Sequence, residues 1–163
     1  MTTVSPDVTL REVADGDLDI FFAHQQEREA VHMAAFTSKD PSDRDAFDGR
    51  WRQMRAAADV TVRTVLVDGV VAGHVATWVD AELGEPEVTY WLGREYWGRG
   101  VATAALRAFL DVFAARPLLG RAAADNVASL RVLEKCGFVV FGESRGHANA
   151  RGEEIAEVLL RLD

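Results

Sequence analysis

The sequence predicts an α/β fold in which a mixed, mostly antiparallel central sheet is flanked by helices. Three observations indicate this class. β-branched residues alternate with other residues over 60–79, which is typical of strands, and apolar residues recur at helical spacing over 102–113. A chain of 163 residues with 48% hydrophobic residues is also long enough to build one core. We expect residues 1–163 to form a single domain.

The N-terminal third predicts one strand and two helices. Residues 8–13 alternate between apolar and polar side chains, which favours a strand. Apolar residues at helical spacing predict a helix over 18–29. A break over 37–41 follows, and a Pro-Ser-Asp helix start predicts a second helix over 41–57.

Three strands are expected next. The segments 60–67 and 70–79 are separated by Asp68-Gly69, a dipeptide that favours a two-residue hairpin turn. A third strand is expected over 87–93, after a turn that contains glycine and proline. The three strands should form an antiparallel meander. The remaining expected elements are a helix after Gly100, a strand over 118–123, a helix over 126–136 ended by Gly137, and strands over 138–143 and 155–162 joined by a polar loop over 144–153.

The segment between the third meander strand and the next helix contains the pattern Gly98-x-Gly100. Glycines allow a ligand to approach the backbone, and the first N–H groups of a helix attract phosphate. A P-loop would require Gly-Lys-Ser/Thr, and a dinucleotide fingerprint would require a third glycine where Thr103 stands. A glycine-rich turn without a ligand is the alternative interpretation.

Two motifs together resemble the GCN5-related N-acetyltransferase (GNAT) superfamily. Its Gln/Arg-x-x-Gly-x-Gly/Ala signature corresponds to Trp97-Gly98-Arg99-Gly100-Val101-Ala102, and its second motif corresponds to Asn126 and to Glu-Lys-Cys-Gly-Phe over 134–138. The resemblance covers roughly residues 87–142. The sequence of these motifs is most similar to the branch that contains the ribosomal-protein N-terminal acetyltransferases.

The resemblance implies that the chain binds acetyl-CoA and transfers acetyl directly to a primary amine in a ternary complex, without a metal. It also implies that the strand before the glycine loop is splayed from its neighbour, so that the pantetheine arm lies between them. N–H groups beside the pantetheine could then polarise the thioester carbonyl. The implied cofactor-binding residues are Trp91, Leu92, Gly93, Gly98, Arg99, Gly100, Val101, Ala102, Thr103 and Asn126.

The sequence departs from the family pattern at two places. Trp97 replaces Gln or Arg, which removes one expected contact to phosphate. The family often has a tyrosine that protonates the leaving thiolate, but Leu133 occupies that helix position. Ser129, one turn earlier, is the substitute hydroxyl that we expect, although a first-turn serine can also bond to the backbone.

The resemblance places a candidate general base at the entrance to the splayed strand. We expect Glu87 to take the proton of the amine, with Glu85, Glu82 and His74 as alternatives. A solvated charge at the strand end is the alternative interpretation of Glu87. The single cysteine, Cys136, is interpreted as a packing residue.

The formal net charge of −8 argues against a nucleic-acid partner. Residues 1–87 contain 17 acidic and 8 basic residues, whereas residues 88–163 contain 9 and 10. The acceptor should meet the acidic half, which favours a cationic amine. The chain has no membrane-length apolar run and its N-terminus is charged, so we expect a cytoplasmic protein without a membrane partner. Residues expected to line an apolar acceptor entrance are His32, Met33, Phe36, Trp51 and Trp78.

The resulting hypothesis is an N-acetyltransferase that acts on a protein N-terminus or a small amine. Two alternatives stay open. One is a non-catalytic CoA-binding or interaction module, because of Leu133 and Trp97. The other is an acetyltransferase for aminoglycoside-like cationic molecules, because of the acidic N-terminal half. The expectation of a homodimer rests on the family resemblance alone.

Overall fold

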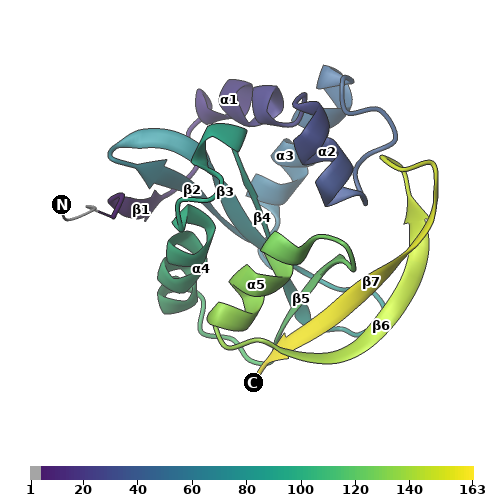
Figure 1. The fold of residues 1–163 in the computed structure, drawn as a ribbon. Coiled ribbons are helices and arrows are strands. Elements are labelled where there is room, and N and C mark those ends of the chain that lie inside the picture. The colour runs from purple at the N-terminus through teal and green to yellow at the C-terminus, as the bar shows by residue number, and fades with distance from the viewer. Residues whose placement is uncertain (1–4) are drawn as a thin grey trace.

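A computed structural model describes residues 5–163 and shows the expected α/β fold (Figure 1). Residues 1–4 of the expected domain lie outside the described residues. One mixed sheet has the strand order β1-β2-β3-β4-β5-β7-β6. Its strands are β1 (Val8–Arg11), β2 (Thr61–Val67), β3 (Val70–Val79), β4 (Pro86–Leu92), β5 (Leu118–Ala123), β6 (Val139–Ala148) and β7 (Glu153–Leu162). The helices are α1 (Asp17–His24), α2 (Arg28–Ala34), α3 (Arg44–Ala56), α4 (Val101–Val112) and α5 (Val127–Lys135), and Arg94–Tyr96 forms a short 3-10 turn.

The sheet consists of two antiparallel parts that meet at one point. Strands β1 to β4 pair antiparallel, as do β5, β7 and β6. The two parts are joined where β4 pairs parallel with β5, at Glu87 opposite Leu119. Beyond Glu87 the two strands diverge toward the start of α4. The predicted splayed strand is therefore confirmed, and it opens a cleft between β4 and β5.

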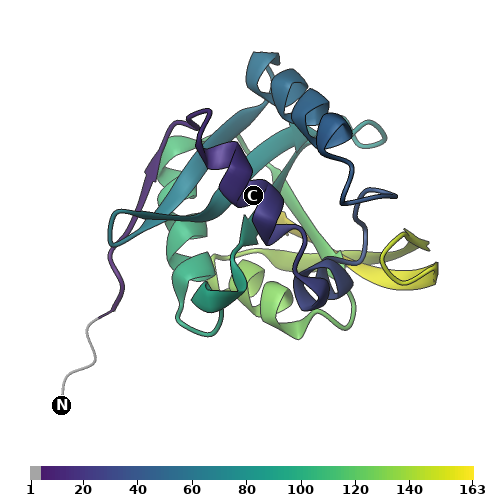
Figure 2. The ribbon, with the colours of Figure 1, turned by 90° about the horizontal axis from the view of Figure 1, so that it is seen from above.

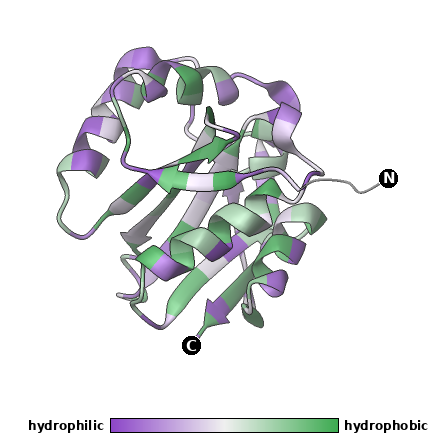
Figure 3. Ribbon diagram, turned by 90° about the vertical axis from the view of Figure 1, so that its left-hand side faces the viewer, coloured by the Kyte–Doolittle hydropathy of each residue, from purple (hydrophilic) through white to green (hydrophobic). Residues whose placement is uncertain are grey.

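Helices cover the two faces of the sheet differently (Figures 1 and 2). Helices α4 and α5 cover one face, where Leu106 and Phe109 of α4 belong to the main core. Helices α1 and α3 cover the β2–β4 part of the other face, where Phe21, Phe47 and Trp51 form a second core. In Figure 3 many residues of the strands are hydrophobic, whereas the helices that cover them also carry many hydrophilic residues.

The predicted helix over 18–29 is wrong, because two helices occupy this region. Helix α1 ends at His24, and α2 begins at Arg28. The carboxylate of Glu27 accepts a hydrogen bond from the N–H of Ala30 at 2.6 Å, which caps α2. The capping carboxylate therefore starts a new helix inside a segment whose apolar spacing looks continuous.

The predicted polar loop over 144–153 is also wrong. Strands β6 and β7 continue through it, pairing as far as Ala148 opposite Glu153, and only residues 149–152 form the connection. The polar side chains lie on a solvent-exposed two-stranded ribbon, where Arg145 donates to Glu154 at 3.1 Å. Apolar alternation cannot identify strands whose outward side chains are all solvated.

Two turn predictions are confirmed. Asp68 and Gly69 both have positive φ, at 51° and 81°, as the two-residue hairpin requires. Gly137 has φ 96° at the end of α5, and Phe138 packs back into the core with 2% exposure. Within residues 5–163 no helix is long and apolar enough to cross a membrane.

Candidate active site

The glycine loop forms an open cradle at the start of α4. Gly98 and Gly100 have φ of 70° and 75°, and Gly100 is the N-cap residue without a side-chain capping bond. A Cβ added to either glycine would meet no atom within 4 Å, and both glycines border the cavity described below. The predicted residues Gly98, Arg99, Gly100, Val101, Ala102 and Thr103 are brought together here. First-turn N–H groups and this free space fit a pyrophosphate.

Two side chains shape the approach to the cradle. The indole N–H of Trp97 donates to the carbonyl of Leu92 at 3.3 Å and so ties the loop to the end of β4. The guanidinium of Arg99 lies 5.7 Å from the ring centroid of Tyr96 and is exposed to solvent. Trp97 therefore has a structural contact at the position where the family pattern places a phosphate ligand.

A cavity of about 850 Å³ runs through the cleft between β4 and β5. Trp91 and Leu92 line it, whereas the N–H of Gly93 donates to Ala72 of β3 at 2.9 Å. Consecutive residues of an antiparallel strand direct their main-chain groups to opposite sides. The N–H of Trp91 therefore also faces β3, and the N–H of Leu92 faces the cleft.

Asn126 links α5 to α2 beside the cleft. Its side-chain oxygen accepts from the N–H of Ser129 at 3.3 Å and caps α5. Its amide nitrogen donates to the carbonyl of Met33, in the last turn of α2, at 3.2 Å. The side chain thus holds α2 against α5 at the cavity that it lines.

Sequence reasoning missed a tyrosine opposite Ser129. The hydroxyl of Tyr90, on β4, lies 2.8 Å from the Ser129 hydroxyl, and both residues line the cavity. Leu133 is buried, and a Cβ on Gly120 would lie 2.9 Å from it. The Leu133 side chain thus fills the core against β5. Tyr90 was missed because no sequence signal distinguishes it from an ordinary tyrosine in a strand.

The opposite face of the sheet forms the other half of the cavity. His74 and Trp91 are cross-strand partners, as are Trp78 and Glu87, so each pair shares one face. The His74 ring lies 4.8 Å from that of Trp51, and burial lowers the pKa of His74 to about 3. His74 is therefore neutral at physiological pH.

Glu87 belongs to a cluster centred on Arg121. The guanidinium pairs with Glu87, with Asp80 at 2.9 Å and with Glu157 at 3.1 Å. The Glu87 side chain is 5% exposed, and this burial raises its pKa while Arg121 opposes part of the rise. One cation faces three carboxylates, so the ionised cluster has a net charge of −2. Arg121 and Glu157 were missed, although Arg121 is the one charged residue of the apolar strand β5.

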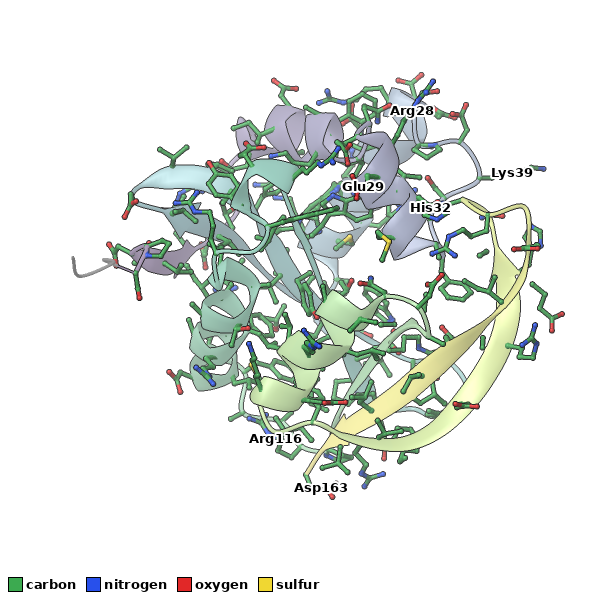
Figure 4. The ribbon with its side chains drawn as sticks, viewed as in Figure 1. Arg28, Glu29, His32, Lys39, Arg116 and Asp163 are labelled. Carbon is green, nitrogen blue, oxygen red and sulfur yellow. The ribbon has the colours of Figure 1, made fainter. Side chains whose placement is uncertain are left out.

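Most residues expected at the acceptor entrance line the cavity, namely Met33, Phe36, Trp51 and Trp78. His32 does not, and its carbonyl accepts from Arg151 at 2.7 Å. Figure 4 shows His32 and Glu29 on α2, and of these two residues Glu29 lines the cavity. The alternative bases Glu82 and Glu85 do not line the cavity either.

The remaining candidates are a thiol and possible metal ligands. The Sγ of Cys136 lies 3.7 Å from the carbonyl of Thr103, and burial raises the pKa of this thiol. Such a thiol is a weak nucleophile. Within residues 5–163 no group of at least three His, Cys, Asp or Glu side chains is arranged to hold a metal ion.

Residues 7–139 match the family model described as the acetyltransferase (GNAT) domain. A curated relative is YdaF of Bacillus subtilis (strain 168), provisionally named a ribosomal N-acetyltransferase. It is 27% identical over 129 residues, which span 74% of this chain and 70% of the relative.

Two solved structures share the fold. Mycobacterium smegmatis RimJ, in complex with CoA-disulfide, has a TM-score of 0.78 and 21% identity, over 95% of this chain and 81% of that chain. Spermidine N-acetyltransferase from Vibrio cholerae, in complex with CoA and spermine, has a TM-score of 0.81 and 18% identity, over 95% and 94%. At 21% and 18% sequence identity, the likeness to these two structures establishes only the fold of this chain.

Proposed function

The chain belongs to the GNAT acetyltransferase family, and from this premise we propose that it transfers acetyl from acetyl-CoA to a primary amine by direct attack. The observation that carries the proposal is the open glycine cradle beside a splayed strand, in one continuous cavity. Acetyl-CoA supplies a thioester whose carbon forms a bond to the amine nitrogen while the C–S electron pair leaves on sulfur.

The chain's own residues bind and orient this cosubstrate. The N–H groups of the loop from Gly98 to Thr103 hold the pyrophosphate at the positive end of α4. The N–H of Leu92 faces the cleft and is the candidate donor to the thioester oxygen. Both RimJ and the spermidine acetyltransferase were solved with CoA species, which supports this assignment.

Glu87 is proposed to accept the proton of the amine. It lines the acceptor half of the cavity, and its raised pKa makes it a better base than a solvated carboxylate. The ion pair with Arg121 favours the ionised form of Glu87, which is the form that can accept a proton. His74, with its pKa near 3, is a poor acceptor at neutral pH.

Glu87→Gln is expected to lower kcat by about 100-fold, because the amine then loses its proton to solvent. The wild-type rate should rise through the Glu87 pKa and then level off, whereas the variant should follow the free-amine fraction over the whole range. Glu154→Gln, on the exposed ribbon, is the matched control. A pH–rate profile with the same shape in both proteins would remove Glu87 from this role.

The acceptor is tested by measuring thiol release with a panel of amines. The panel contains peptides with free N-termini, polyamines and aminoglycosides, and a thermal melt with acetyl-CoA is measured in parallel. Absence of acetyl-CoA stabilisation at millimolar concentration would refute the function. Stabilisation without turnover of any amine would instead favour the non-catalytic module.

A cationic small molecule is the second candidate acceptor. Glu87, Glu157 and Arg121, from the cluster of net charge −2, line the cavity together with Trp78, and an excess of acidic side chains attracts cations. A peptide acceptor in turn agrees with the relative's name. The cytoplasmic location and the homodimer stay predictions.

A further inference from the structure

The Tyr90 hydroxyl connects the two walls of the cosubstrate half of the cavity. It projects from β4, which carries the cleft-facing backbone, and reaches the first turn of α5. It lies 2.8 Å from the Ser129 hydroxyl oxygen and 3.2 Å from the Ser129 carbonyl oxygen. The two residues are 39 positions apart in the chain, so this contact exists only in the folded protein.

Two hydrogen-bond arrangements are compatible with these distances. In one, the Ser129 hydroxyl donates to Tyr90, and Tyr90 donates to the Ser129 carbonyl. In the other, Tyr90 donates to the Ser129 hydroxyl oxygen, which leaves the Ser129 hydrogen free to point into the cavity. A hydroxyl group has one hydrogen and can rotate. The 2.8 Å distance to the Ser129 hydroxyl oxygen suits an O–H···O hydrogen bond better than the 3.2 Å distance to the carbonyl oxygen, which favours donation from Tyr90 to the hydroxyl.

The surroundings of Tyr90 keep its hydrogen in place. Burial raises the pKa of Tyr90 to about 12, although the hydrogen bond with Ser129 opposes part of this rise. Tyr90 is therefore protonated at neutral pH, and its hydroxyl can act as a donor. Ser129 is only half-buried and lines the cavity, so its hydrogen can reach a bound ligand.

We propose that Tyr90 is a positioning residue that donates to the Ser129 hydroxyl oxygen and thereby directs the Ser129 hydrogen at the leaving sulfur of acetyl-CoA. Ser129 then stabilises the thiolate by a hydrogen bond, and no proton needs to be transferred from either hydroxyl. The missing helix tyrosine at Leu133 is thus compensated from the opposite wall. This inference rests on the proposed acetyl transfer.

The test compares Tyr90→Phe, Ser129→Ala and the double variant. The first readout is independent of turnover: the thiolate absorbance of bound CoA is titrated to give the pKa of its thiol. Each single variant should raise this pKa by about half a unit or more, because a hydrogen bond to the thiolate is lost. The second readout is kcat, which should fall by about 5- to 10-fold in each single variant, with the KM for acetyl-CoA within about twofold of wild type.

The double variant decides whether Tyr90 acts through Ser129. If it does, Tyr90→Phe should cause no further loss in the Ser129→Ala background. A Tyr90→Phe variant with wild-type kcat and thiol pKa, or a double variant whose losses multiply, would overturn the inference. Thermal midpoints of all variants exclude a folding defect. An enzyme that binds CoA but acetylates no amine would overturn the proposed function, while the thiol pKa would still test the Tyr90–Ser129 contact.

Discussion

Gly100→Glu is expected to abolish CoA binding, with a dissociation constant raised by more than about 100-fold. A Cβ at Gly100 would meet no atom within 4 Å, so the carboxylate has room at the proposed anion site, where it would repel the pyrophosphate. The residue also adopts φ 75° as the N-cap of α4, a conformation that costs a non-glycine residue about 1 kcal/mol. Calorimetric titration with CoA measures the loss.

The control for this variant separates the cradle from the backbone cost. Gly152 has φ 66° and free space around its Cβ, but it lies in the β6–β7 turn. Gly152→Glu should lose a similar free energy of unfolding and retain wild-type CoA affinity. A Gly100→Glu protein that binds CoA as tightly as Gly152→Glu would show that the pyrophosphate lies elsewhere.

Local signals were sufficient for the elements that depend on local chemistry. The bounds of β3 and β5 were predicted to the residue, because β-branched alternation and a buried apolar run define them. Asp68-Gly69 and Gly137 were predicted because only a few residues tolerate the backbone angles at those positions. The glycine loop could be predicted for the same reason, since its glycines and the start of the following helix are adjacent in sequence.

The incorrect or missing predictions depend on contacts between distant segments. The ribbon extension of β6 and β7 is stabilised by cross-strand pairing of polar residues, which carries no apolar pattern. The Arg121 cluster joins carboxylates of three other segments, 34 to 41 positions away. The family resemblance placed Glu87 at the entrance to the splayed strand, but its partner Arg121 could be found only from the order of the strands in the sheet.

Arg121→Met is expected to destabilise the protein by about 3 kcal/mol at pH 7, because removing one member of a buried ion pair leaves uncompensated charge. The Glu87 and Glu157 side chains are 5% and 8% exposed and would face each other and Asp80 without a cation. Methionine approximates the volume of the aliphatic stem, so the loss reports mainly on charge. Urea unfolding at several pH values measures it.

The pH dependence of this loss distinguishes charge from packing. Without Arg121 the pKa of Glu87 rises further above its unfolded value, since burial already raises it. A raised folded pKa means that stability is lost as pH rises through that pKa. The deficit of Arg121→Met should therefore be smaller near pH 4, where more of Glu87 is protonated, and should grow toward pH 7. Adding Glu87→Gln should recover part of it at pH 7.

Arg145→Met is the matched control for Arg121→Met, because Arg145 pairs with Glu154 on the exposed ribbon, where the two side chains are 61% and 62% exposed. Its loss should stay below about 0.5 kcal/mol at every pH. An Arg121→Met deficit that is equally large at pH 4 and pH 7 would mean that the arginine contributes packing, and that Glu87 does not depend on it for its charge.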